Sequence, residues 1–341
     1  MKLLQSHDDN FDLCRTFLLI SMIFTHAFEQ FYIPDYNRNY TNYVTIGFVF
    51  LSGFTIGVLY FERVRNNPQQ YFKRSVNRAF KLIMIYIIGN LVIIVPSQYK
   101  LHFLLSSGVL KNIVAIFLGT NTEFFAFDIL IPIAITSFFA WFILRYLRKN
   151  VALLFIILFC LFLWFSETMN VLNYFGIKYS IAGFIGCFLG RLITDIEWDH
   201  TLKKLSRYYV TIICGLVIFI YYYIIVYFYK GLVKVHYHLI PTIIILLFVY
   251  LISYDFQLNK YRWFNSVNET LSRQLLFGYL FHLLLIHGLF FIFPKDSLDF
   301  FGTLLVALFL LSVCVITCFF LDFMTSKSLL LKKIYLNIFK V

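Results

Sequence analysis

The sequence FDLCRTFLLISMIFTHAFEQFYI, residues 11–33, is apolar enough to cross a lipid bilayer as a helix, yet it contains several ionisable residues. A helix of this length spans about 34 Å at 1.5 Å per residue. Arg15 and His26 are eleven positions apart, so at about 100° per residue they lie on one helix face. Ionisable side chains are costly in lipid unless they face protein or water. This face is therefore expected to contact something other than lipid.

Two acidic residues lie near the same stripe. Asp12 precedes Arg15 by three positions and Glu29 follows His26 by three, a spacing that brings helical side chains together. The structural interpretation is a buried Asp12–Arg15 ion pair and a hydrogen-bonded core histidine. The functional interpretation is that this stripe is the floor of a reaction site.

The composition predicts an all-α, polytopic integral membrane protein. Hydrophobic residues make up 61% of the 341 residues, charged residues make up 13%, and the mean hydropathy is +0.80. A soluble domain carries about 25% charged residues, so an ordinary soluble protein is excluded. All six cysteines lie in apolar segments without the spacing of a zinc site or of a disulfide framework, so no metal is expected.

Apolar runs of about spanning length predict ten transmembrane helices within a single domain, residues 1–341, with its core at 11–323. A shorter run at 109–119, inside the long segment 99–127, is expected to be re-entrant or interfacial. The ten runs cover residues 11–33, 43–62, 79–98, 128–147, 151–168, 179–194, 208–229, 239–254, 270–293 and 300–323.

The distribution of Lys and Arg predicts the orientation. With ten spans and a cytoplasmic N-terminus, the cytoplasmic side receives about three times as many of these residues as the outer side. Both termini are therefore expected in the cytoplasm. The net charge of +12 is explained by this topology and by contact with anionic membrane lipids, not by nucleic-acid binding. Residues 324–341 are predicted to form a basic amphipathic tail on the inner surface.

The second and third apolar runs add further candidate residues. In FVFLSGF, residues 48–54, Ser52 can present its hydroxyl to a ligand or bond a backbone carbonyl. Gly53 can instead serve close helix packing. Arg74 and Arg78 are four positions apart at the start of a membrane helix, where paired guanidinium groups can clamp phosphates.

These residues together resemble the membrane-bound acyltransferase-3 family. Arg15 and His26 match its Arg-x10-His motif, and residues 48–54 resemble its Phe-Phe-x-x-Ser-Gly-Phe segment, with Val49 in place of the second Phe. Asp12 stands where the family often has an acidic residue. Four motifs in the same order with matching topology form a fairly specific signal.

The remaining two motifs lie at the third and ninth runs. Arg74 and Arg78 resemble the arginine pair of the family, and residues 279–282, Tyr-Leu-Phe-His, resemble its Tyr-Leu-x-His. Between the motifs the resemblance is one of hydropathy alone. The segment that contains Gly57 and Tyr60 is particularly similar to the branch that succinylates osmoregulated periplasmic glucans.

The resemblance implies a multi-pass enzyme of the bacterial inner membrane that transfers an acyl group from cytoplasmic acyl-CoA to a hydroxyl of a surface or periplasmic carbohydrate. Acetyl-CoA is the first expectation and succinyl-CoA the second. The expected catalytic residues are His26, Arg15 and Glu29, of which Glu29 is inferred from the residues and is not part of a family motif. Acyl-CoA is expected to contact Arg74, Arg78, Ser52 and His282, with structural support from Asp12, Gly53 and Phe54.

Several alternatives remain open. His26 can take the proton of the acceptor hydroxyl, or it can itself be acylated first. For His282, core packing is the alternative to a contact with acyl-CoA. A transporter or flippase for a glycan or a lipid-linked precursor also places charges within the membrane, although the sequence shows no inverted repeat. A structural membrane subunit leaves the polar stripe unexplained.

Overall fold

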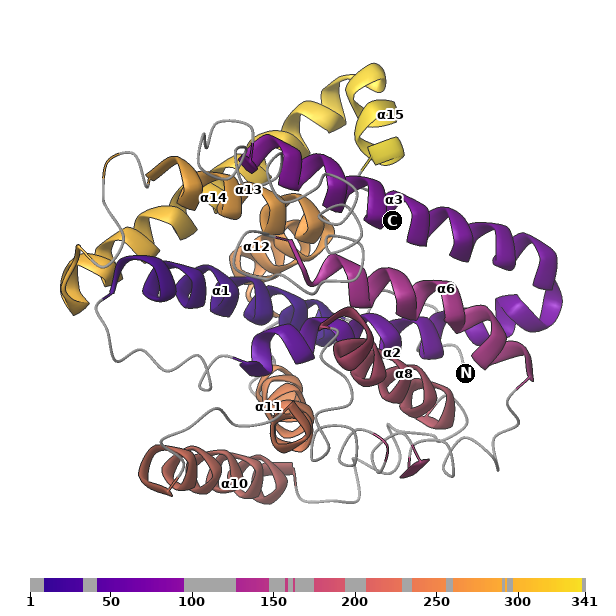
Figure 1. Ribbon diagram of the computed structural model, residues 1–341, viewed down its shortest axis with the longest axis horizontal. Coiled ribbons are helices and arrows are strands. Elements are labelled where there is room, and N and C mark those ends of the chain that lie inside the picture. Colours follow the sequence, from indigo (N-terminus) through magenta and orange to yellow (C-terminus); the bar gives the residue numbers. More distant parts are fainter. Residues whose placement is uncertain are drawn as a thin grey trace, which may run out of the picture. The chain divides into compact units, whose positions relative to one another are not determined.

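The structure, a computed structural model, is almost entirely helical in the part of the chain that it describes. It describes residues 9–32, 42–94, 127–146, 157–158, 162, 175–193, 207–228, 235–255, 260–289, 292 and 297–338. The named helices, shown in Figure 1, are α1 (Asp9–Phe31), α2 (Asn42–Asn66), α3 (Pro68–Ile94), α6 (Leu130–Tyr146), α8 (Phe175–Ile193), α10 (Arg207–Phe228), α11 (Val235–Asp255), α12 (Arg262–Arg273), α13 (Leu275–Leu289), α14 (Phe300–Lys327) and α15 (Leu329–Ile338).

The chain forms two compact units that are interleaved along the sequence. The first unit contains residues 1–6, 45–205 and 234–239, and the second contains residues 7–44, 206–233 and 240–341. Residues of the first apolar run therefore belong to the same unit as residues close to the C-terminus.

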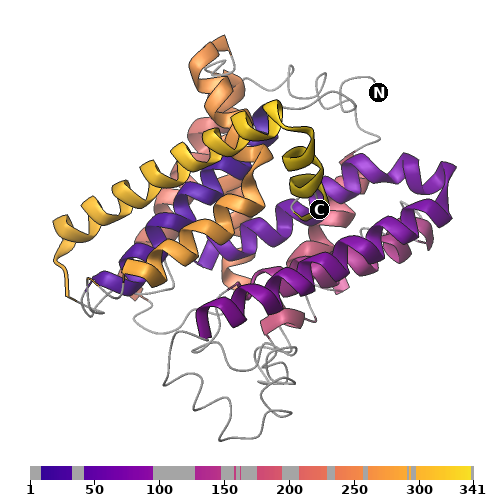
Figure 2. The same cartoon turned by 90° about the horizontal axis from the view of Figure 1, so that it is seen from above.

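In the second unit, α1 packs against α12, α13 and α14. Figure 2 shows α14 running beside α1. Apolar residues of α1 are enclosed in this unit: Leu18, Leu19 and Ile23 are at most 1% exposed. Close packing of α1 on α13 is helped by Gly278, where a Cβ atom would lie 3.0 Å from Cδ2 of Leu19. The polar stripe of α1 is thus held on a helix that tertiary packing fixes.

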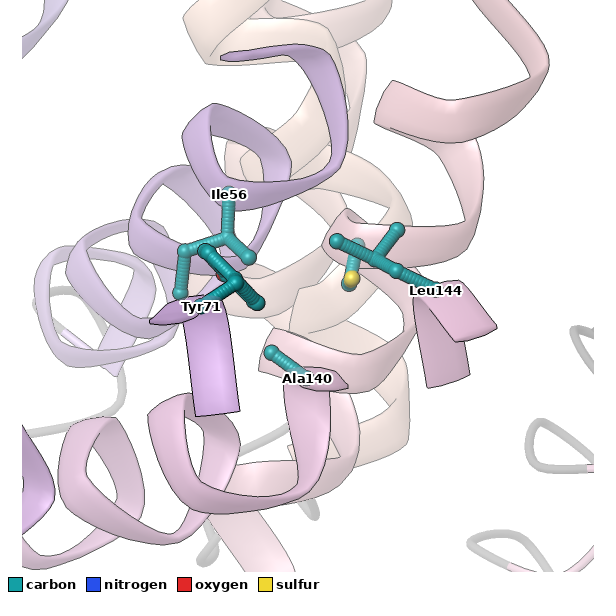
Figure 3. Packing of buried hydrophobic residues seen from close by; sticks show 5 residues of the cluster. Ile56, Tyr71, Ala140 and Leu144 are labelled. Carbon is teal, nitrogen blue, oxygen red and sulfur yellow. The ribbon is translucent and has the colours of Figure 1, made fainter. Parts of the chain in front are cut away.

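In the first unit, α6 packs against both α3 and α8. A buried cluster joins residues of four helices, α2, α3, α6 and α8, and Figure 3 shows its side chains. Its members are Ile56, Tyr71, Ala140, Leu144 and Cys187.

Helix α3 begins earlier than its apolar run predicts. Pro68 occupies the first helical position, where a missing N–H costs nothing, and the side chain of Asn67 accepts a hydrogen bond from the N–H of Gln70 at 3.3 Å. Because the helix starts at this cap, Arg74 and Arg78 lie within its second and third turns. The prediction that these two arginines open a membrane helix is therefore met only in part: both lie in a helix, but it begins six residues before Arg74.

Within the described ranges, three helices are long and apolar enough to cross a membrane: residues 10–31, 43–60 and 300–327. The same ranges contain four shorter apolar helices, at 130–146, 209–221, 238–253 and 275–289. All seven overlap predicted runs, although the helix at 300–327 extends four residues past its run. The total of ten spans and the cytoplasmic location of the termini stay predictions. The expected re-entrant run 109–119 and nearly all of the run 151–168 lie outside the described residues.

The predicted ninth span, residues 270–293, is divided in the structure. Helix α12 ends at Arg273, and Gln274 separates it from α13. The backbone N–H of Gln274 donates a hydrogen bond to the carbonyl oxygen of Thr270 at 2.9 Å. Hydropathy did not predict α12, because most of its residues are polar. Nevertheless Asn268, Leu271 and Ser272, which share one face, are at most 8% exposed.

The C-terminal helices have clear boundaries. Asp299 caps α14, since its carboxylate accepts a hydrogen bond from the N–H of Gly302 at 2.7 Å. Ser328, whose backbone is extended, separates α14 from α15. Helix α15 lies in the segment predicted as a basic amphipathic tail; Leu329 and Leu330 are 86% and 69% exposed, and Lys332 and Lys333 are also exposed. A helix in this part of the tail agrees with the prediction.

Candidate active site on helix α1

The predicted polar stripe of α1 forms two local pairs in the structure. Nη1 of Arg15 donates to Oδ1 of Asp12 at 2.9 Å. One helical turn before the end of α1, Nδ1 of His26 lies 3.3 Å from Oε2 of Glu29. Both pairs have the spacing of three residues from which they were inferred. The sequence-based prediction that these four side chains pair on α1 is therefore confirmed, and their roles in chemistry stay predictions.

Within each pair the carboxylate is more buried than its basic partner, as is useful in an active site. The Asp12 side chain is 3% exposed and that of Arg15 is 27% exposed. Glu29 is 13% exposed and His26 is 28% exposed. In both pairs the carboxylate is the more enclosed member, so it can hold the direction of its partner while the partner remains accessible.

The environment of Asp12 reaches beyond α1. The hydroxyl of Ser272, near the end of α12, donates a hydrogen bond to the same oxygen that accepts from Arg15. The hydroxyl of Thr16 donates to the backbone carbonyl of Asn268 at 3.3 Å. Polar groups of α12 therefore line the N-terminal half of the stripe.

Sequence reasoning did not find this contribution of α12. Ser272 and Asn268 lie in a segment without an apolar run, and nothing in a single sequence states that it packs on α1. The spacing of these residues was the available sequence signal. Positions 268, 271 and 272, which the structure buries, are three and four residues apart and therefore lie on one face of a helix. An amphipathic pattern directly before the predicted ninth span thus indicates a packed helix.

A charged cluster joins α12 to α14 close to these groups. Nη1 of Arg273 donates to Oδ1 of Asp322 at 3.1 Å, and its Nη2 donates to Glu269. Nε2 of Gln274 also bonds Oδ1 of Asp322, at 3.4 Å. These contacts fix the end of α12, and with it Ser272, relative to α14.

His282 lies next to His26. The two imidazole rings are 5.6 Å apart between centroids and are inclined by 23°. His282 is fully buried in α13, and its Nδ1 lies 3.1 Å from the carbonyl oxygen of Gly278. The expected contact of His282 with acyl-CoA stays a prediction, but its position beside the histidine of α1 is a finding that the sequence did not suggest.

The other predicted site residues belong to the first unit. Nη2 of Arg78 donates to the hydroxyl of Ser52 at 3.4 Å, so these two residues, predicted separately to contact acyl-CoA, are neighbours. Arg74 is exposed, whereas Arg78 is partly buried. Phe54 is 8% exposed and its ring stacks on that of Phe50, with centroids 6.1 Å apart.

Gly53 lies where α2 and α8 touch. A Cβ atom at position 53 would be 1.9 Å from the carbonyl oxygen of Gly183, and one at Gly57 would be 2.3 Å from that of Cys187. Glycines on α8 make the reciprocal contacts, since a Cβ atom at Gly186 would be 2.2 Å from the carbonyl oxygen of Phe50. Close helix packing, one of the two interpretations of Gly53, is therefore what the structure contains.

Comparison with known proteins identifies a family that covers most of the chain. A family model described as an acyltransferase domain matches residues 8–323. No curated protein sequence and no solved structure matches the chain. The matched region includes α1 with its His26–Glu29 pair and runs into α14. The chain therefore belongs to the membrane acyltransferase-3 family.

Proposed function

We propose that this protein transfers an acyl group from acyl-CoA to a hydroxyl of a bacterial surface or periplasmic carbohydrate, as a multi-pass enzyme of the inner membrane. Acetyl-CoA is the first candidate donor and succinyl-CoA the second. The observation that supports the proposal most directly is the placement of His26, partly accessible, 3.3 Å from the carboxylate of Glu29 on a helix that is apolar over most of its length. Family membership supports acyl transfer as the reaction.

The His26–Glu29 pair has the properties of a general base. A carboxylate beside Nδ1 favours the tautomer with the proton on Nδ1, which leaves the lone pair on Nε2. Nε2 then takes the proton of the acceptor hydroxyl while the hydroxyl oxygen bonds the thioester carbonyl carbon. The carbon–sulfur bond breaks, and the proton passes from His26 to the departing thiolate of CoA.

Arg15 lies on the same face of α1, about 16 Å along the helix from His26 at 1.5 Å per residue. Asp12 holds its guanidinium group, and Ser272 in turn holds Asp12. A fixed, permanently charged group at this position is suited to bind the polar arm of acyl-CoA on its way toward His26. Arg15 is thus assigned to the donor side of the reaction.

The direct test of the function uses purified protein with acetyl-CoA or succinyl-CoA. Release of free CoA is followed with and without candidate glycans, and mass spectrometry detects the acylated product. We expect release that depends on a glycan. Absence of CoA release with every donor, combined with glycan movement across proteoliposome membranes, would contradict acyl transfer and favour a transporter.

Arg74→Ala combined with Arg78→Ala is expected to weaken CoA binding by about tenfold or more, because hydrogen bonds from guanidinium groups to phosphates are each worth about 1.5–3 kcal/mol. The measurement is a titration of CoA against purified protein, by calorimetry or by ligand-induced thermal stabilisation. Lys332→Ala with Lys333→Ala removes two exposed charges from α15 and serves as the matched control. Unchanged affinity in the arginine variant would remove this pair from the donor site.

A further inference from the structure

The first unit contains an acidic residue just before α6 whose carboxyl group has an unused oxygen. Asp128 precedes Leu130, the first residue of α6, by two positions. Acidic side chains at helix starts usually accept hydrogen bonds from the free N–H groups of the helix, as Asp299 does from Gly302 at 2.7 Å. Among the described residues, Oδ1 of Asp128 is buried and has no hydrogen-bond partner. This oxygen therefore does not cap its helix.

Two contacts show where Asp128 lies along α3. Nε1 of Trp141, in the second half of α6, donates to the carbonyl oxygen of Pro68 at the start of α3, at 2.8 Å. The ring of Phe127 packs near the other end, because a Cβ atom at Gly89 would be 2.7 Å from its Cε2. Helices α3 and α6 are therefore antiparallel neighbours, and Asp128 lies beside the C-terminal part of α3.

That part of α3 contributes buried polar side chains. Tyr86 is 1% exposed, and its hydroxyl interacts electrostatically with the carboxyl group of Asp128. Asn90, one turn later, is 2% exposed, and its Nδ2 donates to the carbonyl oxygen of Tyr86 at 2.9 Å. Asp128 itself is partly exposed, so a ligand can reach its carboxyl group. An accessible carboxyl group thus lies beside a buried polar face.

The backbone before Asp128 has an unusual conformation. Phe127 has a φ of 68°, in the left-handed region that bulky side chains rarely adopt. Its ring is 2% exposed and its carbonyl oxygen accepts from the N–H of Leu130 at 3.0 Å, so the surroundings hold this conformation. Residues in such unfavourable conformations cluster at functional sites. The conformation of Phe127 fixes the direction in which the chain enters Asp128.

The chemistry of this position selects among ligands. A carboxylate repels phosphates, and Tyr86 is eight residues, about 12 Å along the helix, beyond Arg78, which is assigned to the phosphates of CoA. The described residues contain no group of three or more His, Cys, Asp or Glu that could hold a metal ion. Hydroxyl groups do fit, because a carboxylate accepts from them and a carboxylic acid both donates and accepts.

We propose that Asp128 binds a hydroxyl group of the carbohydrate acceptor, with its buried Oδ1 as the accepting atom. The inference rests on the proposed function and assigns the acceptor a binding residue in the first unit. A sugar hydroxyl supplies the partner that Oδ1 lacks, which explains why an oxygen that costs stability is present. In the predicted topology α3 runs outward, so its C-terminal part lies on the side where the acceptor is expected.

Asp128→Leu tests this role, because leucine has a similar shape and forms no hydrogen bonds. We expect its affinity for sugars to fall about tenfold or more, the effect of one lost hydrogen bond to a charged group. The midpoint of thermal unfolding should stay the same or rise, since an unsatisfied buried oxygen has been removed. Affinity for CoA should stay within about twofold of the wild-type value. A carboxyl group with a purely structural role would give the reverse pattern.

The measurement is a calorimetric titration of purified protein with maltohexaose, a β-1,2-linked glucohexaose and chitotetraose. The detergent must lack a sugar headgroup, because such a headgroup would compete for the site. CoA is titrated in parallel, and thermal unfolding is followed in the same samples. Asp299→Ser is the matched control: it removes the carboxyl group at the start of α14 and keeps a capping oxygen. This control should bind sugars as the wild type does.

Three results would overturn the proposal: equal sugar affinity in Asp128→Leu and wild type, no binding of any of the sugars by the wild type, or a loss of affinity accompanied by a lower unfolding midpoint. Failure of the proposed function would look different. Sugar binding that depends on Asp128, in a wild-type protein that releases no CoA from any acyl-CoA donor, would refute acyl transfer and support this binding site.

Discussion

His26→Ala is expected to abolish measurable acyl transfer while the protein still inserts into the membrane and folds. Positioned general bases contribute about 10²- to 10⁴-fold to rate, and the alanine variant keeps no group that can take the hydroxyl proton. The side chain is 28% exposed, so its removal leaves little unfilled volume in the core of the unit. The measurement is glycan-dependent CoA release by purified variant and wild type at equal concentrations of folded protein.

The matched control for this variant is His287→Ala. His287 is also a partly buried histidine, and its Nδ1 lies 2.8 Å from the carbonyl of Leu283, one turn earlier in its own helix. Its removal should leave the rate near that of the wild type. Near-normal transfer by His26→Ala would show that the base lies elsewhere. Loss of transfer in both variants would point to damage from removing any histidine in this unit.

Gly53→Ala is expected to have the largest effect on stability. A Cβ atom at position 53 would be 1.9 Å from the carbonyl oxygen of Gly183, far closer than two such atoms can approach. The obstacle is backbone rather than a flexible side chain, so α2 and α8 would have to separate. Membrane helices associate through close packing more than through hydrophobic burial, and separation removes the contacts that hold them.

The expected cost is about 3 kcal/mol or more, the upper range for overpacked positions. It is measured as a fall in the midpoint of thermal unfolding in detergent and in the fraction of monodisperse protein. Gly288→Ala is the matched control, because nothing lies within 4 Å of a Cβ atom there and alanine favours helix more than glycine does. Equal midpoints for the two variants would show that α2 and α8 do not make this contact.

Local geometry explains what the sequence predicted correctly. Asp12 with Arg15 and His26 with Glu29 are pairs within one helix, so their spacing alone determines that they meet. The apolar runs predicted α1, α2 and α14 in the same way, since length and hydropathy are properties of each segment by itself.

Tertiary packing explains what was missed. The contact between His26 and His282 joins residues from the first and ninth apolar runs. The periodicity within a run does not indicate which other helices are its neighbours. Hydropathy did not predict helix α12, because it detects lipid-spanning segments. The buried face of α12 contains the polar residues Asn268 and Ser272 together with Leu271. In a single sequence, polar residues that are buried against the polar stripe of another helix cannot be distinguished from a solvated loop.

The hydrogen bond between Ser272 and Asp12 has a consequence for biogenesis. Helix α1 is synthesised before α12, and the Ser272 hydroxyl that donates to its carboxylate lies 260 positions later in the chain. While the intervening residues are synthesised, the nascent chain therefore holds charged groups in an apolar helix that still lacks α12, α13 and α14. Newly made protein should depend on the translocon or a membrane chaperone to shelter α1 until those helices arrive.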